Sequence, residues 1–136
     1  MPVYMLDSFA LLAYLDGESG MERVKTILEE ATKDQIRVML PVINLGEILY
    51  ITEREISLVQ AQAALAAIEQ LPIEILPATR EAVLAAAHIK ANHHVAYADA
   101  FVVAAAQEFR ATVLTGDPEF QNVEKLVSVE WLDRKA

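Results

Sequence analysis

The sequence predicts an α/β fold, a three-layer sandwich in which a central parallel sheet of about five short strands is flanked by helices. Short apolar runs alternate along the chain with longer amphipathic segments, the pattern of strands and helices. Most successive apolar runs are separated by one or two predicted helices, which suits the right-handed crossovers of a parallel sheet. The 136 residues contain no internal repeat or linker. We therefore expect a single domain spanning residues 1–136.

The first half of the chain contains two predicted strands and four predicted helices. The apolar run after Pro2 stops at Asp7, and Asp7 or Ser8 can serve as the N-cap of the helix that follows. Pro41 suits the first turn of a later helix. The expected elements are strands at Val3–Leu6 and Ile36–Leu40, and helices at Ser8–Asp16, Met21–Lys33, Val42–Glu55 and Ser57–Gln70.

The second half contains three predicted strands and two predicted helices. Pro72 and Pro77 bracket a short apolar run, and Thr79 is expected to cap the helix after it. The next helix is apolar on most sides, which predicts a central position. The expected elements are strands at Ile73–Leu76, Thr112–Leu114 and Leu126–Val129, and helices at Thr79–Ala91 and Tyr97–Phe109.

Composition limits the classes of function. The chain has 11 basic and 20 acidic residues and a net charge of −9, which by itself disfavours a nucleic-acid partner. Carboxylates clustered around metal would be neutralised in the loaded state, and two bound divalent cations would change this sum to −5, so a nucleic acid would have to be recognised at such a site rather than through long-range attraction. The chain has no cysteine, which excludes disulfides and thiolate metal ligands and fits a cytoplasmic protein.

Hydropathy points to an oligomer and away from a membrane. Hydrophobic residues make up 54% of the sequence and the mean hydropathy is +0.28, high values for a small domain with much surface to cover. We expect part of this surplus to be buried in a partner interface. No apolar run approaches the roughly 18 residues of a membrane span.

Four acidic residues are candidates for a functional site, although each has an ordinary alternative. Asp7 follows the first strand and could be only a helix N-cap, whereas Asp117 follows the fourth strand in a Gly–Asp–Pro sequence typical of turns. Glu47 could belong to a solvent face with Asn44 and Arg54. Asp99 is the single charged residue between Val95 and Ala106, and its alternative is an N-cap of a helix starting at Ala100.

The joint placement of the four acids favours a metal site. Asp7 and Asp117 follow strands whose carboxyl ends meet at one edge of a parallel sheet. Glu47 and Asp99 lie near the starts of helices at that same edge. Carboxylates gathered in this way repel one another unless a cation is present. Oxygen ligands suit Mg²⁺ or Mn²⁺, and Thr115 at the end of the fourth strand can donate a hydrogen bond to a neighbouring carboxylate.

In four segments the sequence resembles the PIN domain family, and more narrowly the VapC-type toxin ribonucleases. The resemblance covers nearly the whole chain, and the four segments occur in the family's order. They are Met5-Leu6-Asp7-Ser8, Asn44-Leu45-Gly46-Glu47, Tyr97-Ala98-Asp99-Ala100 and Leu114-Thr115-Gly116-Asp117-Pro118-Glu119-Phe120.

The resemblance implies a metal-dependent endoribonuclease that hydrolyses RNA phosphodiester bonds. It implies a five-stranded parallel sheet, a homodimer and, for the toxin branch, inhibition by a small antitoxin partner. The family often has a small hydroxyl residue where this chain has Phe9. The resemblance assigns the acids Asp7, Glu47, Asp99 and Asp117 to Mg²⁺ or Mn²⁺ binding, with Ser8, Asn44 and Thr115 as supporting residues.

Two alternatives remain open at this point. One is a PIN-like interaction module that cuts nothing, although such a module would tend to lose one of the four acids. The other is an acidic-site phosphatase or phospho-receiver protein. The aspartyl-phosphate phosphatases usually have a second Asp two residues after the first, and this chain has Phe9 there. A receiver would also need paired acids at the first strand and a Lys after a late strand.

Overall fold

The computed structural model describes residues 1–132, and the five strands within that range form one parallel sheet. The strand order is β3-β2-β1-β4-β5. From β1 the chain adds strands on one side of the sheet and then crosses to the other side, so the order reverses between β1 and β4. The strands are β1 (Val3–Leu6), β2 (Arg37–Pro41), β3 (Glu74–Leu76), β4 (Thr112–Thr115) and β5 (Ser128–Trp131).

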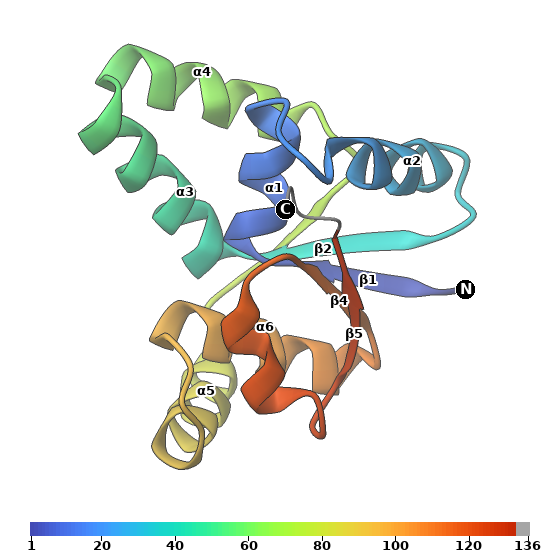
Figure 1. Ribbon diagram of the computed structural model, residues 1–136, viewed down its shortest axis with the longest axis vertical. Helices are drawn as coiled ribbons and strands as arrows, with labels where there is room; N and C mark the ends of the chain where they lie inside the picture. Colours follow the sequence, from blue (N-terminus) through green and yellow to red (C-terminus); the bar gives the residue numbers. More distant parts are fainter. Residues whose placement is uncertain (133–136) are drawn as a thin grey trace.

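Helices cover both faces of the sheet (Figure 1). α1 and α2 lie on one face and α5 and α6 on the other, while α3 and α4 form a hairpin that projects from the carboxyl edge of the strands. A short 3₁₀ helix, η1, connects β4 to β5. The helices are α1 (Ser8–Leu15), α2 (Met21–Thr32), α3 (Val42–Glu55), α4 (Leu58–Glu69), α5 (Arg80–Asn92), α6 (Tyr97–Phe109) and η1 (Pro118–Val123).

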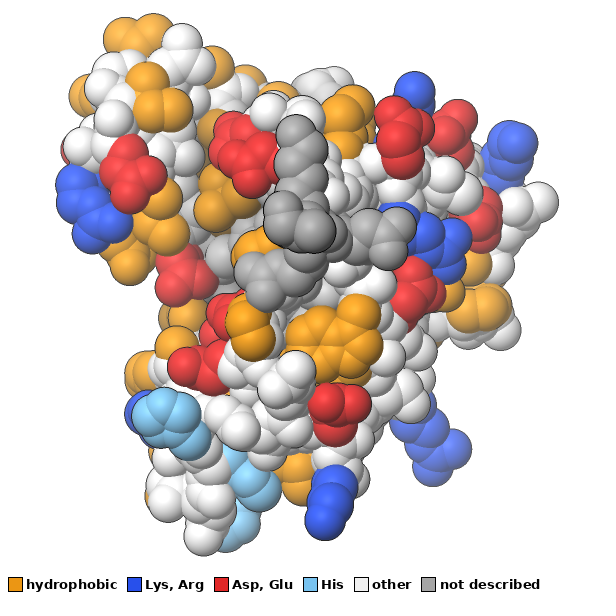
Figure 2. Space-filling view, in the orientation of Figure 1, with side chains coloured by type: hydrophobic (Ala, Val, Ile, Leu, Met, Phe, Trp, Pro, Cys, Tyr) orange, Lys and Arg blue, Asp and Glu red, His pale blue; other side chains and the backbone are white. Residues whose placement is uncertain are grey.

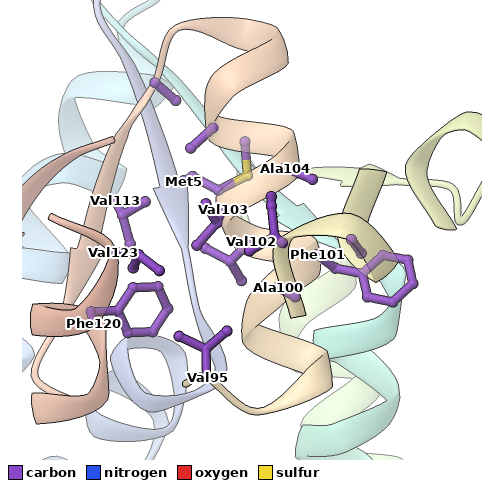
Figure 3. Packing of buried hydrophobic residues seen from close by; sticks show 14 of the residues in the cluster. Met5, Val95, Ala100, Phe101, Val102, Val103, Ala104, Val113, Phe120 and Val123 are labelled. Carbon is purple, nitrogen blue, oxygen red and sulfur yellow. The ribbon is translucent and has the colours of Figure 1, made fainter. Parts of the chain in front are cut away.

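Alternate residues of the central strands enter two separate cores. Met5 and Val113 point toward α6, as Figure 3 shows, and are fully buried there. Leu6 and Leu114, one residue further along, are fully buried on the face covered by α1 and α2. Strands buried on both faces read as continuous apolar runs, which is why these strands are recognisable in the sequence. The predicted three-layer α/β sandwich is confirmed.

Most predicted boundaries agree with the structure to within one residue, and two local predictions differ by more. The fifth strand begins at Ser128 rather than Leu126, because Leu126 and Val127 pack against the α5–α6 core before the strand starts. Glu130 then fixes the strand to α2 by accepting hydrogen bonds from Arg23 Nε at 2.6 Å and Nη2 at 3.1 Å. The turn expected at Asp117 is extended by η1, which was not predicted. No helix within residues 1–132 is long and apolar enough to cross a membrane.

Candidate active site

Asp7 lies at the reversal of strand order, directly after the central strand β1. Its Oδ1 accepts the backbone N–H of Ala10 at 2.8 Å, so the alternative role as N-cap of α1 is real. Its Oδ2 accepts the hydroxyl of Thr115 at 2.5 Å, the hydrogen bond predicted for this threonine. Burial raises the pKa of Asp7 from 3.8 to about 7, although both hydrogen bonds oppose that shift. Asp7 therefore carries a costly charge in addition to capping a helix.

Asp117 is joined to Asp7 through the same threonine. The Asp117 N–H donates to Thr115 Oγ1 at 3.0 Å, and Asp117 Oδ1 accepts the N–H of Glu119 at 3.0 Å. Asp117 therefore also has the turn role considered as its alternative, because it is the N-cap of η1. A continuous chain of hydrogen bonds thus runs from the Asp7 carboxylate through the Thr115 hydroxyl, the backbone N–H and carboxylate of Asp117, and the backbone N–H of Glu119.

Asn44 and Glu47 face inward on the first turns of α3, so their assignment to a solvent face is wrong. Ser8 Oγ donates to Glu47 Oε1 at 2.5 Å, and Asn44 Nδ2 donates to Ser8 Oγ at 3.3 Å. Asn44 is fully buried, and within residues 1–132 its Oδ1 has no hydrogen-bond partner. Arg54, further along α3, is exposed. An unpaired buried acceptor is costly and marks a place where a donor or cation fits.

Asp99 is the third residue of α6, and the alternative in which it caps a helix starting at Ala100 is wrong because the helix starts at Tyr97. Asp99 is buried, with only 7% of the residue exposed. Burial raises the pKa of Asp99 from 3.8 to about 8, with further contributions from the charges of Asp7, Asp117, Glu47 and Glu119. The structure therefore brings the other three acids predicted from sequence within electrostatic reach of Asp99.

Glu119 is a fifth acid of this group, and sequence reasoning did not single it out. Its only signal in the sequence is the spacing of two residues from Asp117. Its carboxylate accepts the backbone N–H of Ala96, which directly precedes α6. Such a contact between segments 23 residues apart depends on tertiary structure.

The acids offer oxygen atoms of the kind that divalent cations prefer, but their side chains do not form a coordination shell. Across residues 1–132, no three His, Asp or Glu side chains already stand as a ligand set around one point. Two features nevertheless favour a cation. Burial, with repulsion from the neighbouring acids, raises the pKa of Asp99, and within residues 1–132 the side-chain oxygen of Asn44 has no hydrogen-bond partner. All available ligands are oxygens, which fits Mg²⁺ or Mn²⁺. Figure 2 shows acidic side chains gathered between the α3–α4 hairpin and the α5–α6 pair.

Replacing Thr115 tests the link between the two strand ends. Thr115→Val is expected to lower the free energy of unfolding by about 1–3 kcal/mol, because the buried Asp7 carboxylate and the Asp117 N–H each lose a partner. Thr115→Ser retains the hydroxyl and is the matched control. Urea denaturation measures both. Equal stability of the two variants would show that the hydroxyl is not needed.

Gly116 explains why the chain tolerates Phe9 next to the site. A Cβ at Gly116 would lie 2.3 Å from Cε1 and 2.8 Å from Cζ of the Phe9 ring. We expect Gly116→Ala to destabilise the protein by about 1–3 kcal/mol, because the ring must move. Gly46→Ala is the control, since no atom lies within 4 Å of its Cβ and alanine favours the α3 helix by about 0.5–1 kcal/mol. Thermal melts that show the same change for both variants would contradict this packing.

The fold and the acid group together define a class: a doubly wound parallel α/β domain with carboxylates at the reversal of its strand order. A family model described as PIN domain matches residues 4–126. The chain therefore belongs to the PIN domain family. The comparison with curated proteins finds no match.

Solved structures share the fold at low sequence identity. A structure of VapBC2 from Rickettsia felis, bound to a DNA fragment from its promoter, has a TM-score of 0.76 at 16% identity, over 96% of this chain and 99% of the other. DNA-bound VapBC from Salmonella typhimurium has a TM-score of 0.74 at 18% identity, over 96% and 98%. Mycobacterium tuberculosis VapC20, described as a sarcin-ricin loop cleaving toxin, has 0.68 at 18%, over 87% and 92%.

Proposed function

We propose that this protein is a metal-dependent endoribonuclease that hydrolyses RNA phosphodiester bonds, and that it is the toxin of a toxin–antitoxin pair. The observation that carries the proposal is the electrostatic coupling of Asp99 to Asp7, Glu47 and Asp117. Glu47 and Asp99 lie on α3 and α6, Asp7 and Asp117 lie just after β1 and β4, and the chain belongs to the PIN domain family. Carboxylates gathered in this way repel one another and lower the stability of the fold. A bound cation would relieve that repulsion, which supports a functional site here.

Asp7, Asp99 and Asp117 would hold the metal, Mg²⁺ or Mn²⁺, with Glu47 as a further ligand or as a group that orients water. When bound, the ion supplies positive charge at the phosphate and lowers the pKa of water, which a chain with a net charge of −9 does not do by itself. Thr115 and the N–H of Ala10 hold the Asp7 carboxylate in one orientation. Ser8 does the same for Glu47 through Oε1.

The proposed partners are an RNA substrate, a second copy of the chain and a small antitoxin. Support for the protein partners comes from large apolar side chains that are exposed on the α3–α4 hairpin, among them Tyr50, Leu58 and Val59. The similar structures named VapBC and VapC20 support the assignment to a toxin–antitoxin pair. A cytoplasmic location is part of the proposal, because the toxin would act on cellular RNA.

Metal binding and cleavage test the proposal together. Isothermal titration with Mn²⁺ is expected to show saturable binding, and RNA cleavage is expected with Mg²⁺ or Mn²⁺ and to stop on addition of EDTA. A non-catalytic interaction module would bind no metal at this site. A phosphatase would instead release phosphate from a phosphomonoester while leaving RNA intact. Either of those results would replace the nuclease proposal.

A further inference from the structure

Helix α6 begins without a side-chain cap of its own. Its N-cap residue is Ala96, whose methyl group cannot accept a hydrogen bond. The N–H of Ala96 is instead accepted by Glu119 Oε1, which reaches it from η1. One of the backbone donors at the start of α6 is therefore satisfied from another part of the chain.

The residue that would normally take this donor is Asp99. In a capping box, the acidic side chain at the third helical position reaches back to the N–H of the N-cap residue. Asp99 occupies that third position relative to Ala96. Because Glu119 already accepts the N–H, the Asp99 carboxylate does not, and no hydrogen bond to it occurs within residues 1–132.

The segment that carries Glu119 is held firmly against the start of α6. Asn122 Nδ2 donates to the carbonyl oxygen of His94 at 2.8 Å, two residues before the N-cap. The side chains of Phe120 and Val123 lie beside that of Val95 in the same core, as Figure 3 shows. The residues that directly follow Glu119 along η1 thus fix this segment against the start of α6.

We propose that Glu119 is a positioning residue that caps α6 from η1 and thereby leaves the Asp99 carboxylate free to bind a cation. The backbone N–H of the same residue donates to Asp117 Oδ1, and the Asp117 N–H donates to Thr115, whose hydroxyl donates to Asp7. Glu119 therefore links the strand-end acids to the helix that carries Asp99. The capping of α6 by Glu119 does not depend on the proposed function. Its effect on metal binding at Asp99 does rest on the proposed function.

The experiment compares Glu119→Ala, which removes the acceptor, with Glu119→Gln, whose amide oxygen can still accept the Ala96 N–H. Thr79→Ala is the matched control, because it removes the side-chain cap of α5 away from the acids. Mn²⁺ affinity is measured by isothermal titration. We expect E119A to weaken Mn²⁺ binding by about tenfold or more, E119Q to remain close to wild type, and T79A to melt at a lower temperature with unchanged affinity.

A crystal structure of metal-free E119A gives a second readout. The Asp99 carboxylate is expected to turn back and accept the Ala96 N–H. An Asp99 side chain that stays in place, or Mn²⁺ affinity unchanged by E119A, would overturn the proposal. Equal weakening by E119A and E119Q would overturn it as well, because it would mean that Glu119 acts through its charge. Wild-type protein that binds no Mn²⁺ would refute the proposed function. The E119A structure would still show whether Glu119 keeps the Asp99 carboxylate from capping α6.

Discussion

Asp99→Asn is expected to lower RNA cleavage in the presence of Mg²⁺ by on the order of a thousandfold or more, with the fold retained. Asparagine preserves the size of the side chain but removes the charge that would hold the cation. The metal-free variant is expected to be more stable than the wild type above neutral pH, because one of the mutually repelling carboxylates is gone. A fluorescent RNA cleavage assay and a thermal melt measure the two effects.

Glu108→Gln is the matched control, since Glu108 is an exposed acid on the same helix, outside the acid group. It should leave cleavage unchanged. Wild-type cleavage rates in the Asp99 variant would remove this residue from the site and with it the main support for the nuclease proposal.

The metal-free protein is expected to lose stability as the pH rises from about 4 to about 8. Asp7 and Asp99 have folded-state pKa values of about 7 and about 8, both raised from 3.8. A carboxyl with a raised folded-state pKa binds its proton more tightly in the folded protein. Its contribution to stability is therefore complete below the unfolded pKa and is lost as the pH rises through the folded value. For Asp7 alone the loss is about 4 kcal/mol.

Thermal melts at about pH 5.5 and about pH 8.5 in EDTA measure this loss, which is expected to lower the melting temperature by on the order of 10 °C. Millimolar Mg²⁺ or Mn²⁺ should restore much of it at the higher pH, because a cation favours the ionised carboxylates. Asp99→Asn should show a smaller pH dependence. A metal-free melting temperature that rises over this range would contradict the raised pKa values.

The sequence predicts the layers and strands of this fold because their signals are local. Apolar strands buried on both faces remain visible as short runs, and prolines or capping residues mark several boundaries. The start of β5 cannot be predicted from local sequence signals. It depends on where Leu126 and Val127 pack and on the hydrogen bonds between Arg23 and Glu130, residues 107 positions apart.

In the candidate site, too, residues with a local sequence signal can be predicted, and residues placed by tertiary contacts cannot. Asp7 and Asp117 can be placed from sequence because each directly follows a strand. Asp99 stands out because a charge interrupts an apolar helix. The inward orientation of Glu47 could not be decided, since a helix that is apolar over most of its surface does not reveal which side meets the sheet. Glu119 was missed because its contact with Ala96 joins two segments that only the tertiary fold brings together.

The central place of β1 in the sheet has a consequence for biosynthesis. The partner of Asp7 is Thr115, which lies 108 residues later in the chain, on a strand that pairs directly with β1. A nascent polypeptide emerging from the ribosome thus carries its first acid long before it contains the last. The acid group cannot be complete until β4 and the residues after it have been made, so truncated products that end before β4 would lack Asp117 and the Thr115 partner of Asp7.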